Sequence, residues 1–214
     1  MRSLLASLGL FLAVAPGASA DILLDQQYSF SSSFADSTNG NVSEVGQTFT
    51  VGIAGTLARI DVSMFRLSGI FDPTGPAVLS VYNTTGGNPT GAPLTSVSKP
   101  KVDISLNVAS FASFDVSAAS ISVNVGDKLS FGISSPGSEV GPYFLPTTDF
   151  PGYAGGNGVN RIINPVGAWQ LSQNFDHGFQ TFVNAAIPEP SAFVLSFITG
   201  ISLAFSRRRR TVEF

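Results

Sequence analysis

The only histidine in the chain is His177, so any imidazole chemistry has to use it. A serine hydrolase needs this ring as a base and a carboxylate to orient it. Asp176 is adjacent in sequence, and in a strand its side chain would point to the opposite face. The Gly-x-Ser-x-Gly sequence of a nucleophile elbow does not occur. We therefore expect His177 to be a structural or surface residue, and we expect no catalytic site.

Few residues could bind metal or act as an acid pair. Zinc needs several ligands, and the chain has one histidine and no cysteine. Glycoside hydrolysis uses two carboxylates, but the glutamates between the terminal segments are Glu44 and Glu139, both in polar, loop-like surroundings. Aspartates could supply oxygen ligands to a structural calcium ion. These are Asp25, Asp36, Asp72, Asp127 and Asp149. Aspartate beside Gly or Pro is typical of turns, so the sequence assigns no ligand.

Residues 141–169 are expected to form loops between the last strands, and they contain several aromatic side chains among Pro, Gly and Asn. Such rings can stack on the faces of sugars while nearby Asn and Asp bind hydroxyl groups. They can equally pack under a long loop as a small secondary core, and this second interpretation is the more common outcome. The sugar-binding hypothesis places a glycan platform at Tyr153 and Trp169.

Alternating apolar residues indicate that strands position these side chains. Residues 128–134 place Leu129, Phe131 and Ile133 on one face. Eight or nine short strands separated by Gly- and Pro-rich turns predict an all-β fold, an antiparallel β-sandwich of jelly-roll type. Residues 29–46 are expected to form a loop. The expected strands are residues 22–27, 47–51, 60–64, 77–82, 102–108, 111–116, 121–125, 128–134 and 179–184.

Several short sequences resemble the bacterial choice-of-anchor surface domains. They include Gln47-Thr48-Phe49, Gly126-Asp127-Lys128-Leu129 and Tyr153-Ala154-Gly155-Gly156, followed by Trp169. The resemblance spans most of residues 44–184. It implies a carbohydrate-binding jelly roll carried on proteins with different C-terminal anchors.

Charge and composition limit the partners of the central domain. Residues 21–187 contain six basic and twelve acidic residues, which gives a net charge of −6. This balance argues against a nucleic acid or an anionic surface as partner. The absence of cysteine excludes disulfides and thiolate chemistry, so packing must supply the stability.

The first 20 residues predict a signal peptide. Arg2 supplies the positive charge, residues 4–14 form an apolar run, and Pro16 follows it. Ala18 and Ala20 match the small-x-small cleavage rule. We expect the mature chain to begin at Asp21.

The C-terminal segment, residues 187–214, has three parts. Pro188-Glu189-Pro190 precedes an apolar run at residues 192–205, and Arg207, Arg208, Arg209 and Arg210 follow it. As a helix the 14-residue run would extend about 21 Å, which is short for a hydrocarbon core of about 30 Å. The arginines would hold the C-terminus in the cytoplasm and leave the prolines outside.

These three parts resemble the PEP-CTERM sorting signal of exopolysaccharide-producing Gram-negative bacteria. The resemblance implies that a membrane-embedded exosortase recognises the segment, that the helix spans the membrane before processing, and that the remainder reaches the cell surface or matrix. Ile187 replaces the commoner Val, and Ser196, Thr199 and Ser202 make the helix more polar than usual. The alternative is an ordinary single-span anchor.

The sequence therefore predicts a signal peptide (residues 1–20), a β-sandwich domain (21–186) and a sorting signal (187–214). The sequence therefore favours a noncatalytic exported protein of the cell surface or extracellular matrix. We expect this protein to bind exopolysaccharide and to carry no cofactor. The alternative is a secreted hydrolase acting on matrix glycans.

Overall fold

The computed structural model describes residues 21–29, 34–38, 43–138, 141–148, 152–163, 166–172 and 175–185. Within this part of the chain, no helix is long and apolar enough to cross a membrane. Some predictions lie outside the described residues. They concern Ala18 and Ala20, Glu139 and Asp149, Pro188-Glu189-Pro190, residues 192–205, and Arg207 to Arg210.

The described fold consists of strands and three single-turn 3-10 helices, without an α-helix, which confirms the all-β prediction. The strands are β1 (Ile22–Tyr28), β2 (Phe34–Ser37), β3 (Ser43–Thr50), β4 (Gly55–Arg66), β5 (Ala77–Thr85), β6 (Asn88–Lys99), β7 (Ser110–Asp115), β8 (Ser122–Val123), β9 (Lys128–Ser134), β10 (Tyr143–Thr147), β11 (Gly158–Ile162), β12 (Gln170–Ser172) and β13 (Phe179–Ala185). The 3-10 turns are η1 (Gly69–Phe71), η2 (Lys101–Asp103) and η3 (Ser117–Ala119).

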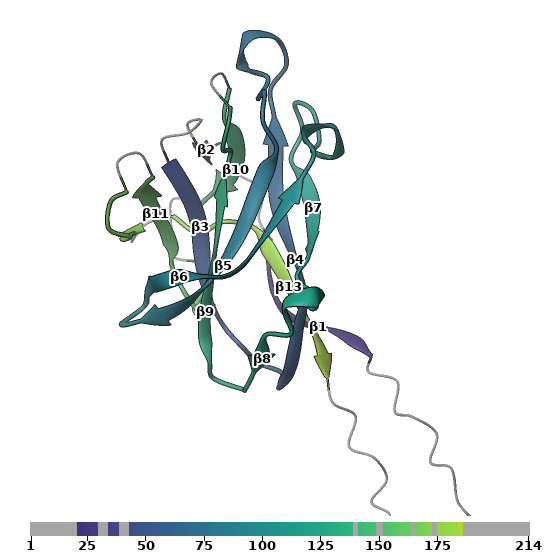
Figure 1. Ribbon diagram of the computed structural model, residues 1–214, viewed down its shortest axis with the longest axis vertical. Coiled ribbons are helices and arrows are strands. Elements are labelled where there is room, and N and C mark those ends of the chain that lie inside the picture. Colours follow the sequence, from purple (N-terminus) through teal and green to yellow (C-terminus); the bar gives the residue numbers. More distant parts are fainter. Residues whose placement is uncertain are drawn as a thin grey trace, which may run out of the picture. The chain divides into compact units, whose positions relative to one another are not determined.

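Two antiparallel sheets contain all of these strands. Sheet 1 has the order β1-β13-β4-β10-β2, and β7 and β8 also pair with β4. Sheet 2 has the order β12-β11-β3-β9-β5-β6. Figure 1 shows how strands far apart in sequence lie side by side, with β3 beside β9 and β1 beside β13. The antiparallel prediction is confirmed.

Apolar side chains from both sheets form one core, so the fold is a β-sandwich. Sheet 1 contributes Ile60 and Val62 from β4, and sheet 2 contributes Leu79 from β5 and Phe131 from β9. The alternation predicted for residues 128–134 is confirmed, because Leu129, Phe131 and Ile133 are all buried in this core. Burial of each such side chain stabilises the fold by roughly 1.5–3 kcal/mol.

The strand predicted at residues 102–108 is wrong. This segment begins as η2 and continues as an irregular loop held against the end of β4. Arg66 donates its backbone N–H to Ser105 and accepts one from Asn107. Asn107 has a φ of 61°, a left-handed conformation that cannot continue a strand. Similarly, the strand predicted at residues 121–125 is only two residues long, because Asp127 accepts the backbone N–H of Asn124 and starts a turn.

Two segments predicted as loops contain strands. Residues 29–46 include β2 and the start of β3, and residues 141–169 include β10 and β11. β11 pairs with β3 through Asn160↔Val45 and Arg161↔Glu44, so its position depends on a partner far away in sequence. β2, β3 and β11 contain polar or glycine residues at several positions, and Pro146 interrupts β10. The apolar periodicity that identifies β9 is therefore weak in these strands.

Candidate functional site

A buried ion pair lies on the outer face of sheet 2. Glu44 on β3 and Arg161 on β11 are directly opposite each other in the sheet. Arg161 contacts the Glu44 Oε2 atom through Nη2 at 2.7 Å and Nε at 2.9 Å. Their side chains are 3% (Glu44) and 18% (Arg161) exposed. Because charge-assisted hydrogen bonds compensate for lost hydration, the pair can remain at a site with little access to water.

Neighbouring strands shape the space around Glu44. Gly132 on β9 lies between β3 and β5, and a Cβ atom there would collide with the Glu44 carboxyl group. Tyr82 on β5 reaches across this gap and donates its hydroxyl to Glu44 Oε1 at 2.9 Å. Arg161 Nη2 in turn donates to the Tyr82 hydroxyl at 2.9 Å. Glycine at position 132 therefore permits a three-residue polar network.

Burial changes the proton affinity of both acidic groups in this network. Loss of water raises the pKa of Glu44, and the charge and hydrogen bonds of Arg161 only partly offset that effect. Burial and the nearby Glu44 carboxylate raise the pKa of Tyr82 to about 12. The network thus favours a protonated phenol at every physiological pH.

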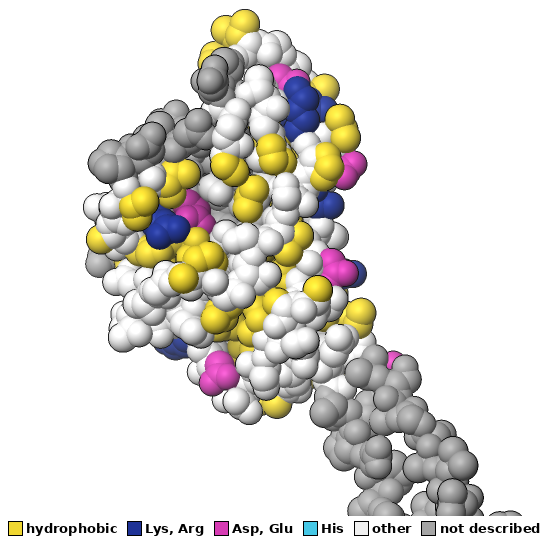
Figure 2. Space-filling model, in the orientation of Figure 1, with side chains coloured by type: hydrophobic (Ala, Val, Ile, Leu, Met, Phe, Trp, Pro, Cys, Tyr) yellow, Lys and Arg dark blue, Asp and Glu magenta, His cyan; other side chains and the backbone are white. Residues whose placement is uncertain are grey.

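Trp169, one of the two residues of the predicted glycan platform, packs on this network. The guanidinium carbon of Arg161 lies 4.5 Å from the centroid of the indole, within the range of a cation–π contact. The Tyr82 ring meets the indole edge-on at 5.3 Å. Trp169 is only partly buried. Figure 2 shows this face, with a basic and an acidic side chain side by side over β3 and β11 among hydrophobic side chains.

Tyr153, the second platform residue, has a different environment. Its ring packs edge-on against Phe179 at 5.0 Å and contacts Tyr28 at 5.9 Å. Its hydroxyl donates to Gln26 Oε1 at 3.2 Å and accepts the backbone N–H of Thr50 at 3.4 Å. Tyr153 and Trp169 therefore contact separate sets of residues, and Tyr153 packs at the margin of the core.

His177 and Asp176 tie a loop to sheet 2. Asp176 accepts hydrogen bonds from the Gln47 side chain at 2.8 Å and from the backbone N–H groups of Gly152 and Tyr153 at 3.1 Å. The backbone N–H of His177 donates to Gln47 Oε1 at 3.0 Å. The His177 side chain is fully buried. Burial lowers the pKa of His177 against smaller opposing effects of Asp36 and Asp176. This arrangement supports the structural interpretation of His177.

The described aspartates considered for calcium have other partners. Asp25 accepts the backbone N–H groups of Gly52 and Ile53 at 2.8 and 2.6 Å. Asp72 forms ion pairs with Arg66 and Lys101, each at 2.8 Å. Among the described residues, no three His, Cys, Asp or Glu side chains gather closely enough to hold a metal ion.

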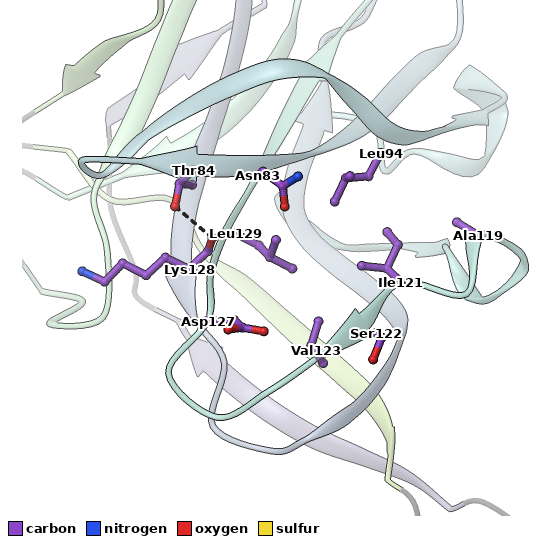
Figure 3. A pocket seen from close by; sticks show the side chains of 10 residues that line it. All are labelled: Asn83, Thr84, Leu94, Ala119, Ile121, Ser122, Val123, Asp127, Lys128 and Leu129. Carbon is purple, nitrogen blue, oxygen red and sulfur yellow. Dashed lines mark hydrogen bonds between the residues drawn. The ribbon is translucent and has the colours of Figure 1, made fainter.

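A pocket of about 610 Å³ lies between the β5–β6 hairpin and the segment around β8. Figure 3 shows Leu94 from β6 and Ile121 and Val123 from the segment around β8 directed into it, with Asn83 beside them and Lys128 directed away. Its volume is that of a small-molecule site. Sequence reasoning missed this pocket because its lining comes from segments that are distant in the chain.

The ionisation of the tyrosines tests whether Tyr82 and Tyr143 are buried as the structure shows. Burial raises the pKa of Tyr82 and that of Tyr143 to about 12. An unfolded tyrosine ionises at about pH 10, so the unfolded chain releases protons first and the folded state loses stability as the pH rises from 10 to 12. We expect ultraviolet titration of the folded protein to show two of its four tyrosines ionising last. Tyr82→Phe should remove one of these late steps, and four simultaneous ionisations near pH 10 would contradict the burial.

Comparison with known protein families finds no match. The search of characterised proteins finds no match either. The function must therefore be argued from the chain's own residues.

Proposed function

We propose that this chain is a noncatalytic protein that is exported by its signal peptide, sorted by an exosortase through Pro188-Glu189-Pro190, and displayed at the surface or in the matrix of a Gram-negative bacterium. The positions of the outermost strands support this proposal. β1 starts at Ile22, just after the expected cleavage at Ala20, and β13 ends at Ala185, just before the sorting signal begins at Ile187. Neither processing step would therefore remove a strand from the sandwich. We assign this sandwich to the jelly-roll type.

The proposed ligand of the mature domain is exopolysaccharide, bound around Trp169. One observation carries this assignment: a partly exposed indole is held in a fixed orientation by Arg161 and Tyr82 on the outer face of sheet 2. A rigid aromatic ring loses little conformational entropy when a sugar stacks on it, and adjacent polar groups can bind hydroxyls. Tyr153 is a weaker candidate, because its ring and hydroxyl already have partners in the fold.

The test is co-sedimentation of residues 21–187 with the host's own exopolysaccharide, with calcium and with a chelator. We expect saturable binding that Trp169→Ala weakens about tenfold, equivalent to about 1.4 kcal/mol. Trp169→Phe should retain part of the affinity, and Tyr153→Ala should change it little. Dependence on calcium would add a structural ion to the proposal.

Phe71→Ala is the matched control, because Phe71 is an exposed aromatic residue on η1. Unchanged binding by a folded Trp169→Ala/Tyr153→Ala variant would refute the aromatic site. The alternative function, hydrolysis of matrix glycans, gains no support from Glu44, whose carboxylate is bound by Arg161 and Tyr82. Cleavage of the polysaccharide that a carboxylate substitution abolishes would establish that alternative.

A further inference from the structure

The first and last strands of the sandwich are paired, so the folded domain begins and ends at the same place. Ile22 on β1 lies opposite Asn184 on β13, and the Ala185 N–H donates to the Asp21 carbonyl at 3.3 Å. β4 starts at this end, where Gly55 pairs with Ala185, and continues to Arg66 (Figure 1). At about 3.4 Å per residue, Arg66 is roughly 37 Å away along the strand.

Apolar side chains are exposed at this end of the domain. Ile22, Leu23 and Leu24 are consecutive residues of β1 and are 58%, 42% and 47% exposed. β1 is the edge strand of sheet 1. Pairing places Leu24 opposite Phe182, whose ring lies 3.8 Å from the guanidinium carbon of Arg59. We call Ile22, Leu23, Leu24 and Phe182 the apolar collar. Ile22, Leu24 and Phe182 share one face of sheet 1, and Leu23 is on the other face at the same end of the domain.

The combination of side chains in the collar fits the boundary between lipid headgroups and acyl chains. Aliphatic and aromatic side chains gain free energy by leaving water there. Arg59 beside them covers apolar surface with its stem, while its guanidinium group is paired with Asp61 at 3.0 Å. None of the three exposed residues of β1 belongs to the hydrophobic core.

The chain length after β13 limits how far the collar can be from the tail. Residues 186–191 separate Ala185 from Ala192, the first residue of the apolar run. Even a fully extended chain spans at most about 25 Å between these two residues. If the run inserts into the bilayer, Ala185 must therefore remain within about 25 Å of the membrane surface. The collar residues, at most three positions from Ala185 or its neighbours along the paired strands, must remain within about 35 Å of that surface, whereas Arg66 can be farther away.

We propose that the apolar collar rests in the lipid interface of the membrane that holds the unprocessed tail. This inference depends on the proposed insertion of the sorting signal. The tether supplies a high effective concentration of lipid, so a small apolar surface suffices for contact. Removal of the tail ends that advantage, and the mature domain then leaves the membrane. The collar thus couples retention of the domain to the presence of the tail.

The absence of cysteine allows a direct test on the full chain. Single substitutions Leu23→Cys, Val102→Cys and Ile201→Cys each receive a nitroxide spin label. The protein is reconstituted into zwitterionic phosphatidylcholine vesicles, because the net charge of −6 on residues 21–187 opposes binding to an anionic surface. Relaxation by oxygen and by a water-soluble nickel complex then reports the depth of each label. Val102 is the matched control, because it is an aliphatic residue that is 73% exposed near Arg66 at the other end of β4.

We expect the Ile201 label in hydrocarbon, the Leu23 label at the interface and the Val102 label in water. An Ile201 label in hydrocarbon with a Leu23 label in water would overturn the lipid contact of the collar and leave the sorting proposal intact. An Ile201 label in water would overturn insertion of the tail itself. Spin–spin broadening at Leu23 would identify a second copy of the chain as the occupant and would also overturn the lipid contact. In residues 21–187, which lack the tail, the Leu23 label should report water; persistent lipid contact there would refute the role of the tether.

Discussion

Replacing Arg161 with methionine is expected to lower the free energy of unfolding by about 3 kcal/mol at pH 7. The Glu44 carboxylate is almost fully buried and has its ion pair with Arg161. Methionine retains apolar contact with Trp169 and removes the charge, so the variant leaves a buried anion without a cation. Urea unfolding of the domain measures the loss.

The pH dependence of the stability lost in Arg161→Met shows whether the loss comes from the unpaired Glu44 charge or from packing on Trp169. Burial already raises the pKa of Glu44, and Arg161 is the main group that counteracts the rise. Without Arg161 the pKa rises further, so the folded state binds a proton more tightly than the unfolded state, whose carboxyl titrates near 4.5. Stability therefore falls as the pH increases through the interval above 4.5. Arg161→Met should cost much less at pH 4 than at pH 7.

Two variants serve as controls for the Arg161 prediction. Glu44→Gln/Arg161→Met removes the titrating group and should abolish the added pH dependence. Lys128→Met removes an exposed cation on β9 that forms no ion pair with the described residues, and it should cost less than about 0.5 kcal/mol. An equal cost of Arg161→Met at both pH values would mean that the loss comes from packing on Trp169.

The sequence predicts best those strands that contribute one alternating face to the core. Residues 128–134 form β9 with the expected bounds, and residues 77–82 lie within β5. Every second residue of these segments is a large apolar side chain, so the two-residue period is visible without knowledge of the partner strand. The same rule fails at residues 102–108, where a local turn and bonds to Arg66 override the apolar pattern.

The network around Trp169 could not be assembled from the sequence in the same way. Glu44 and Arg161 are 117 residues apart, and only the register of β11 on β3 brings them together. The sequence places Glu44 in polar, loop-like surroundings, whereas in the structure it lies buried on β3. One signal was present: Arg161 is the only lysine or arginine between Lys128 and Arg207. An isolated cation among apolar and glycine residues indicates a specific anionic partner but not which one.

Phe179→Ala is expected to lower the free energy of unfolding by about 3–5 kcal/mol, the usual cost of removing a fully buried phenylalanine. Phe179 belongs to sheet 1, yet its ring packs against Phe49 at 6.0 Å and Phe131 at 5.8 Å in sheet 2. It also supports the ring of Tyr153. The substitution leaves a cavity between the sheets that rigid strands can only partly close. Calorimetry and urea unfolding measure the effect.

A matched substitution on the same strand isolates the contribution of this interior position. Phe182 is three residues farther along β13, is only partly buried, and packs under Arg59 instead of in the core. Phe182→Ala should therefore cost about 1 kcal/mol, well below the cost of Phe179→Ala. Phe179→Leu, which refills most of the space, should fall between them. If both alanine variants lower the free energy of unfolding by the same amount, Phe179 does not join the two sheets. Contacts other than the Phe179 ring would then hold Tyr153 at the margin of the core.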